Sequence, residues 1–480
     1  MFRWRSEPYE IYVALQTDTL TGMDMKKNRE DGNLQISGNA IVNGIIWQQL
    51  LLYFFPLLFG TFFQQLYNTV DAVIVGRFVS KQALAAVGGS SATIVNLYVG
   101  FFIGVASGAT VIIAQFYGAR RTEEVGRAVH TAIAMALIGG AVFMIIGFLT
   151  APWAITAMRT PEDTVAGSVL YLRIYFCGMI PNLLYNIGAG ILRAVGDAKR
   201  PLYVLILSCF ANIILDTFFV LQLHMGIAGV AIATIICQTL SAVLVLVILM
   251  RSQECYAVIP SKIRIDTDML ARIIHIGLPS GIQSMMYTIS NLLIQTAING
   301  FNTDAVSAWA AYGKIDCVFW MIISSLGIAI TTFVGQNYGA GQYRRVRRSV
   351  RECFGLSASI TIGLSALLLL FGQYLYVLFT TDPNVMKIGT DMMRYLVPFY
   401  ITYIGIEMFS GALRGMGDSV MPMILTIGGV CVLRVTWVLV AVPIDHRITT
   451  VMASYPITWT TTSILFFFYY EWYVRRHKIV

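Results

Sequence analysis

Charged residues are scarce in this sequence: Asp, Glu, Lys and Arg make up only 12% of the chain, whereas 57% is hydrophobic. A soluble globular domain carries about 25% charged residues, so this chain lacks the charge to cover its surface in water. The composition therefore excludes a soluble enzyme. It indicates an integral membrane protein that is surrounded by a lipid bilayer.

Several motifs that would indicate other chemistry are absent. The seven cysteines form no CxxC pair and lie in or beside apolar runs, which favours unpaired side chains. The sequence also lacks HExxH, GxSxG and the phosphate-binding GxxxxGKS or GxxxxGKT. We therefore expect no enzyme activity, no ATP-driven pump, no resident metal and no cofactor. The net charge of +8 lies in short clusters rather than in a basic stripe with aromatic residues, which argues against nucleic-acid binding.

Twelve apolar runs are long enough to cross the ~30 Å hydrocarbon core of a bilayer as helices, which takes about 20 residues each. The expected spans cover residues 45–76, 83–116, 127–151, 164–190, 200–222, 226–250, 270–298, 305–337, 350–380, 386–411, 420–443 and 449–473. Several exceed the minimum length, so we expect tilted or kinked helices. The sequence thus predicts an all-α membrane protein.

The loops between these spans differ sharply in basic residues. Alternate loops and the C-terminal tail hold 19 Lys and Arg residues, with a cluster of five at 344–351, whereas the other loops hold only five. Because basic loops stay in the cytoplasm, both termini are expected on the cytoplasmic side of the cell membrane. A wrong number of spans would have disturbed this alternation.

The two halves of the sequence are related. Residues 192–197 (LRAVGD) recur as 413–418 (LRGMGD), and Gly118 recurs as Gly339, both with an offset of 221 residues. Because six spans separate the equivalents, the halves have the same orientation, as in many secondary transporters. We expect an N-lobe of six helices over 43–255 and a C-lobe of six helices over 256–475, around a central cavity.

The two ends of the chain are polar. Residues 1–42 are expected to form a cytoplasmic tail, because no apolar segment typical of a signal peptide precedes residue 41. Translation could start at Met1, Met23 or Met25. Residues 476–480 form a short basic tail.

Two carboxylates lie within N-lobe spans, Asp71 in the first and Asp216 in the fifth. Each is about six residues from the end of its span on the side opposite the basic loops. Both acids therefore lie about 9 Å below the membrane surface on that side. Asn212 lies one turn from Asp216, and Thr234 of the sixth span returns to similar depth. These oxygen atoms could hold Na⁺ transiently, or the carboxylates could bind a proton. The alternative is a structural role, with the acids bonded to helix ends or to Arg173.

The C-lobe does not repeat these acids, because the equivalent positions are Ile294 and Trp437. Four charged residues lie in or near its spans: Lys314, Asp316, Glu407 and Arg434. Ionisable groups inside a bilayer are costly and are usually paired or functional. We expect these four to pair with one another and stabilise the lobe. The alternative is a second polar site that selects substrate.

Several short motifs occur in the order and spacing of a known family. They are residues 67–71 (YNTVD), 84–88 (LAAVG), 115–119 (QFYGA), 336–340 (QNYGA) and the paired LRxxGD segments. Over about residues 45–473 the chain resembles the multidrug and toxic compound extrusion (MATE) transporters. The resemblance implies two six-helix lobes, alternating access, and efflux of organic cations or other amphiphilic compounds in exchange for Na⁺ or H⁺.

Within the family, the sequence is most similar to the DinF-like branch. The residues at the positions of that branch's cation or proton site are Asp71, Asn212, Asp216 and Thr234, with Tyr171 in the same network. Pro56 matches the proline at which the first helix of that branch bends. Gln283 stands near the position where another branch has a glutamate, which argues against that branch. We expect a monomer.

Two other functions are alternatives to efflux. A flippase of the same superfamily, for a lipid-linked oligosaccharide or precursor, predicts a larger and more cationic cavity. A membrane receptor or scaffold predicts sizeable soluble domains, and the loops here are too short for them.

Overall fold

The protein is described by a computed structural model that covers residues 39–158, 160–380 and 382–479. Most of the predicted tail lies outside these residues, as do the possible starts at Met1, Met23 and Met25. Its last residues form a short helix, α2 (Ala40–Asn43). The Arg345 side chain donates to the carbonyl oxygen of Ile41 at 2.9 Å and also to that of Gly44, which holds this helix against the C-lobe.

Twelve long helical units follow in the described residues. The N-lobe contains α3 (Ile46–Phe78), α4 and α5 (Lys81–Gly88, Ser90–Gly118), α6 (Thr122–Ala157), α7 and α8 (Glu162–Cys177, Met179–Ala194), α9 and η2 (Lys199–Thr217, Phe218–Gln222), and α10 (Gly226–Met250). The C-lobe contains α11 (Thr267–Ile298), α12 (Thr303–Gly339), α13 (Tyr343–Val377), α14, η4 and α15 (Pro383–Leu396, Val397–Phe399, Tyr400–Met416), α16, η5 and α17 (Val420–Thr426, Ile427–Val432, Leu433–Ile444), and α18 (Ile448–Arg476). All twelve expected spans are therefore helical, with ends that differ by several residues.

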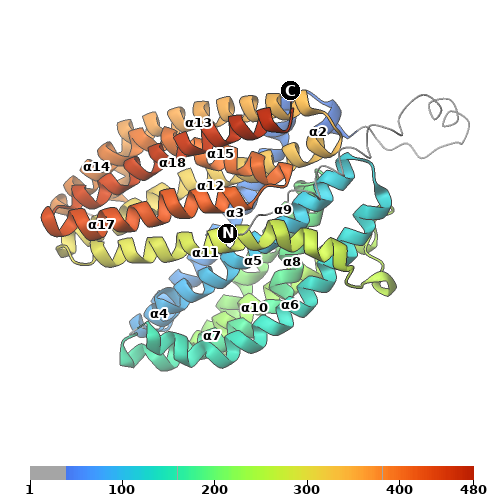
Figure 1. The fold of residues 1–480 in the computed structure, drawn as a ribbon. Coiled ribbons are helices and arrows are strands. Elements are labelled where there is room, and N and C mark those ends of the chain that lie inside the picture. The colour runs from blue at the N-terminus through green and yellow to red at the C-terminus, as the bar shows by residue number, and fades with distance from the viewer. Residues whose placement is uncertain (1–38, 159, 381, 480) are drawn as a thin grey trace, which may run out of the picture. The chain divides into compact units, whose positions relative to one another are not determined.

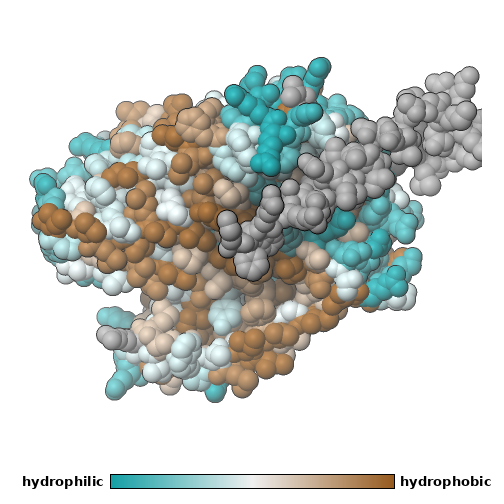
Figure 2. Space-filling model, viewed as in Figure 1, coloured by the Kyte–Doolittle hydropathy of each residue, from teal (hydrophilic) through white to brown (hydrophobic). Residues whose placement is uncertain are grey.

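The helices have the length and polarity of a membrane protein. Among the described residues, nine units are long and apolar enough to span a bilayer, and α7 with α8 make a tenth that is bent by 52°. The remaining two, α11 and α18, are 32 and 29 residues long but more polar. Apolar side chains form a broad band over both lobes, with hydrophilic side chains gathered at the ends (Figure 2). The all-α membrane fold is confirmed.

The lobes lie side by side and meet at one end. Helices α6, α7, α8 and α10 lie on one side and α13, α14, α15 and α18 on the other (Figure 1). We name the end with the basic loops, where α5, α8, α12 and α15 finish, the basic end. At the opposite end the ribbons of α4 and α7 diverge from those of α14 and α17 (Figure 1).

The first helix of each lobe packs into the other lobe at the basic end. In α3, Leu50 lies in the C-lobe core, whereas Val75 lies in the N-lobe core. In α11, Ile273 lies in the N-lobe core, and Ile294 packs with Val438 in the C-lobe. Each lobe therefore contributes half a helix to the other.

The repeated motifs make the same contact twice across the lobe interface. Gln115 Nε2 donates to the carbonyl oxygen of Gly415 at 2.8 Å, and Gln336 Nε2 donates to that of Ala194 at 2.6 Å. Each glutamine thus bonds to the LRxxGD segment of the opposite lobe. The fourth residues of the two QxYGA segments, Gly118 and Gly339, pack directly against the backbone of Gln336 and Gln115. These contacts close the basic end.

The segment between α10 and α11 is fastened to α6. Arg127 Nη2 and Asp266 Oδ2 form an ion pair at 2.7 Å. The Ile259 N–H donates to His130 Nε2 at 3.0 Å, and the Asp266 N–H donates to Thr131 Oγ1 at 3.2 Å. The connection between the lobes is therefore held on the N-lobe at the basic end.

The ion pair makes a testable contribution to stability. Two donors of Arg127 hold the pKa of Asp266 below its ordinary value. The pair stabilises the fold above the ordinary Asp pKa of about 4, and its contribution is lost only as pH falls through the lowered value. We expect Asp266→Asn to lower the unfolding temperature in detergent slightly at pH 7, and the difference from wild type to shrink below about pH 4.

A second variant separates the ion pair from helix capping. Asp266 Oδ1 also accepts from the Met269 N–H at 3.1 Å, which caps α11. Asn keeps this cap and Ala does not, so Asp266→Ala should unfold at a lower temperature than Asp266→Asn. Equal unfolding temperatures for wild type and Asp266→Asn at pH 7 would show that the pair contributes nothing.

Candidate functional site

Each lobe contains a large pocket. The N-lobe pocket has a volume of about 900 Å³ and is lined by residues of α3, α4, α5, α7, α8, α9 and α10, with one residue of α12. The C-lobe pocket has a volume of about 570 Å³ and is lined by residues of α11, α12, α15, α17 and α18. Both volumes are typical of sites for drug-sized ligands.

The two N-lobe acids lie against each other. Asp71 of α3 and Asp216 of α9 are 8% and 0% exposed, and the carboxyl groups interact directly, with the Asn212 side chain beside Asp71. Among the described residues, no hydrogen bond reaches either oxygen of Asp216 or Oδ1 of Asp71. Two ionised carboxylates only accept hydrogen bonds, so their contact is favourable only when a proton or a cation lies between them.

Asp71 and Asn212 line the N-lobe pocket, and so do the other two expected residues, Thr234 and Tyr171. Thr234 of α10 is buried, and its hydroxyl donates to the Val230 carbonyl at 3.0 Å, which leaves the oxygen free to bind a cation. Tyr171 of α7 lies near both acids and stacks on Tyr175, with ring centres 6.1 Å apart. The structure thus brings together all five residues that the sequence singled out in the N-lobe; their role in coupling stays a prediction.

The donor set suits a small hard cation. It consists of two carboxylates, the Asn212 amide oxygen and the Thr234 hydroxyl oxygen. Both oxygens of Asp216 and the Asn212 amide are buried with no hydrogen-bond partner in the described part of the chain. Oxygen ligands of this kind bind Na⁺ or a proton rather than a soft metal ion. The site therefore has the ligand types that one such positive charge needs, and its binding and release stay a prediction.

Sequence reasoning missed several polar residues of the N-lobe pocket. Asn182 and Asn186 of α8 line it, and Asn186 Nδ2 donates to Asn182 Oδ1 at 3.1 Å. Two amides one turn apart in an apolar span were a signal that could have identified this face of the helix. Tyr175 and Gln238 line the same pocket and lie 3.4 Å apart.

The expectation that the four charged C-lobe residues pair with one another is wrong. Asp316 accepts from Trp320 Nε1 at 2.5 Å and from the Tyr400 hydroxyl. Glu407 instead lies 3.8 Å from Arg414, about two turns further along α15. Each acid thus has its partner close by in sequence or on an adjacent helix.

Lys314 does not join the others. Asp316, Glu407 and Arg434 line the C-lobe pocket, whereas Lys314 is exposed and lines the N-lobe pocket. Lys314 and Asp316 are two residues apart in α12 and so lie on different faces of the helix. Lys314 is therefore excluded from the predicted C-lobe polar site, and the other three support the alternative of a second polar site.

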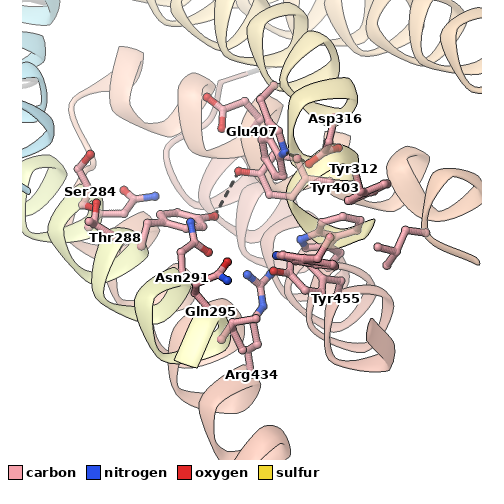
Figure 3. A pocket seen from close by; sticks show the side chains of 18 of the residues that line it. Ser284, Thr288, Asn291, Gln295, Tyr312, Asp316, Tyr403, Glu407, Arg434 and Tyr455 are labelled. Atoms are coloured by element: carbon pink, nitrogen blue, oxygen red, sulfur yellow. Dashed lines mark hydrogen bonds between the residues drawn. The ribbon is translucent and has the colours of Figure 1, made fainter. Parts of the chain in front are cut away.

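Several C-lobe residues were missed because tyrosines and tryptophans are common in membrane helices. The hydroxyl groups of Tyr287 and Tyr403 lie 3.3 Å apart (Figure 3). Tyr312 and Tyr455 also face the pocket. Only the tertiary structure shows that these rings converge.

Pro56 lies inside α3, which continues unbroken from Ile46 to Phe78. A proline within a helix removes one backbone hydrogen bond, so bending is easier there. A bend at Pro56 stays a prediction.

The structure has two lobes of six membrane helices, which are related by a sequence repeat. Each lobe contains a polar pocket. This architecture defines a two-lobed membrane transporter. The sequence model described as MatE matches residues 56–218 and 279–440, one copy in each lobe. The chain therefore belongs to the MatE family, whose members are transporters and not enzymes.

Curated relatives cover nearly the whole chain. A probable multidrug resistance protein of Bacillus subtilis, YoeA, is 27% identical over 446 residues, which cover 90% of this chain and 95% of the relative. A second B. subtilis protein of the same description, YpnP, is 27% identical over 82% of this chain and 87% of its own. The probable multidrug resistance protein NorM of Thermotoga maritima is 24% identical over 79% and 82%.

Solved structures share the fold. A MOP superfamily transporter from Pyrococcus furiosus, whose report describes a binding pocket of reverse polarity, superimposes with a TM-score of 0.85 at 22% identity, covering 92% of this chain and 99% of that one. An outward-facing multidrug resistance MATE transporter gives a TM-score of 0.85 at 22% identity, covering 92% and 98%.

Proposed function

We propose that this chain is a secondary antiporter of the DinF-like branch, which exports amphiphilic compounds, organic cations among them, in exchange for H⁺ or Na⁺. The observation that supports it most is the buried pair Asp71 and Asp216: among the described residues, no donor reaches either oxygen of Asp216 or Oδ1 of Asp71. Such a pair gains a positive charge at little cost and holds it away from lipid. The relatives described as probable multidrug resistance proteins support export of small molecules.

The coupling follows from alternating access. A cation that enters from the end opposite the basic loops neutralises the acid pair and changes the packing of α3 around Pro56. The cavity then loses affinity for its load, and release of the ion at the basic end restores it. A ligand can drive such a change only by its difference in affinity between the two states.

The setting of this transporter is part of the proposal. The basic loops favour a cell-membrane protein with both termini in the cytoplasm, and contacts that close the basic end then correspond to an outward-facing conformation. A single chain contains both lobes and both pockets, which is consistent with a monomer. Pocket volumes of about 900 and 570 Å³ suit a small amphiphile better than a lipid-linked oligosaccharide.

Purified protein in dye-loaded proteoliposomes tests this function. We expect an imposed pH gradient or an imposed Na⁺ gradient, applied separately, to drive export of a cationic dye. A tenfold ion gradient supplies about 1.4 kcal/mol, which can concentrate dye about tenfold at one-to-one exchange. Dye movement that neither gradient changes would reject antiport, and transfer of a fluorescent lipid without dye export would favour the flippase.

A further inference from the structure

Arg434 is a buried charge at the middle of a membrane span. It is 2% exposed and lies ten residues, or about 15 Å, before Ile444 at the end of its span. It lies two residues after the end of the π-helical turn η5, and such turns within helices are frequent at functional sites. A guanidinium at this depth is costly unless an anion or several acceptors compensate it.

The protein supplies little compensation. Arg434 Nη2 donates to Thr458 Oγ1 at 3.3 Å, and the guanidinium lies 4.3 Å from the ring centre of Tyr455. Its Nε is buried without any acceptor among the described residues. The described residues also place no carboxylate within 4.0 Å of it.

The two acids of the same pocket are engaged elsewhere. Asp316 accepts from Trp320 and Tyr400, and Glu407 lies 3.8 Å from Arg414. Figure 3 shows Asp316 and Glu407 at one end of the pocket and Arg434 at the other, beside Asn291, Gln295 and Tyr455. The pocket thus has an uncompensated positive end.

A continuous aromatic wall connects the two ends. The ring centres of Trp309 and Tyr455 are 5.8 Å apart, those of Tyr455 and Trp459 5.4 Å, and those of Trp459 and Trp320 6.1 Å. All four rings line the cavity of about 570 Å³. Such a wall binds a flat aromatic ring, since stacked and edge-to-face contacts are both available.

We propose that the C-lobe pocket binds aromatic organic acids, whose carboxylate is held by Arg434 and whose ring packs on the wall formed by Trp309, Tyr455, Trp459 and Trp320. A carboxylate matches the planar guanidinium and supplies the acceptor that Nε lacks. This inference rests on the proposed function, because it names a substrate class for the same transporter. It extends that class from organic cations to compounds with a carboxylate.

A pair of dyes that differ in one group tests the carboxylate. A rhodamine with a free carboxylate and its methyl ester share ring, size and positive charge. Binding to purified wild-type protein in detergent is measured by fluorescence anisotropy. We expect the free acid to bind about tenfold to a hundredfold more tightly than the ester, as charge-assisted hydrogen bonds in a buried site provide.

Substitution of the arginine should remove this preference. Arg434→Gln is expected to weaken binding of the free acid by about tenfold or more and to leave the ester unchanged, whereas Arg434→Lys should retain part of the preference. Arg173→Gln is the matched control, because Arg173 is an exposed arginine of an N-lobe helix that lies over Phe148. This variant should bind both dyes as wild type does.

Two results would overturn the inference. One is equal affinity of the wild-type protein for the acid and the ester, a comparison that uses the wild-type protein alone. The other is a full preference for the acid in Arg434→Gln protein that elutes as a single species from size exclusion. Asp71→Asn protein should keep the preference, so a failure of ion coupling is distinguished from a failure of this binding site.

Discussion

Asp71→Asn and Asp216→Asn are each expected to reduce efflux in proteoliposomes to the rate measured without an ion gradient. Either substitution removes one of the two carboxylates that are in contact. The altered site then binds the coupling cation equally weakly in the outward-facing and inward-facing states, so the cation cannot drive the change between them. The new amide can also donate to the remaining carboxylate, which in the wild type has at least one oxygen without a donor among the described residues. We therefore expect both variants to fold and to be as stable as wild type or more stable, by up to about 1.5–3 kcal/mol.

Lost transport together with retained stability is the result expected of a coupling site, because an acid pair needed for folding would lower stability as well. Transport under separate pH and Na⁺ gradients gives the first quantity, and thermal unfolding in detergent gives the second. Asp163→Asn is the matched control, because Asp163 lies exposed in the first turn of α7 at the same end of the lobe. Gradient-driven efflux at the wild-type rate in Asp71→Asn protein would reject this coupling site.

Sequence reasoning predicted the spans and the N-lobe acids for the same physical reason. Crossing a bilayer needs a long apolar run, and an acid inside such a run is rare and therefore conspicuous. Depth along each span followed from counting residues, which placed Asp71, Asp216 and Thr234 at one level. Depth alone left the direction of the side chains open, and the structure supplied it.

The C-lobe shows where this reasoning fails. In a bilayer, both the lipid-facing and the packed face of a helix are apolar, so the hydrophobic pattern does not indicate which face points inward. Lys314 and Asp316 therefore seemed to belong together, although they face different pockets. The exchange of half of α3 and α11 between the lobes was likewise invisible, because it depends on contacts between residues more than 100 positions apart.

Gly339→Val is expected to open the basic end. A Cβ atom at Gly339 would meet the backbone of Gln115, and backbone cannot move aside as a flexible side chain does. Overpacking of this kind costs about 3 kcal/mol, which changes the ratio of closed to open forms about 150-fold. Alternating access then fails, because the state closed at the basic end is no longer populated, and efflux should fall by a similar factor.

Thiol labelling measures this opening directly. The parent for this experiment is a protein whose seven cysteines are replaced. Ala194→Cys then introduces one cysteine at a fully buried position, whose backbone carbonyl accepts a hydrogen bond from Gln336 across the lobe interface. It should react slowly with a membrane-impermeant maleimide in the parent and rapidly when Gly339→Val is added. Gly355→Val is the matched control, because a Cβ there meets nothing within 4 Å. Slow labelling together with undiminished efflux in the Gly339→Val protein would show that the lobes accommodate the valine side chain. The glycine contact would then not be needed to close the basic end.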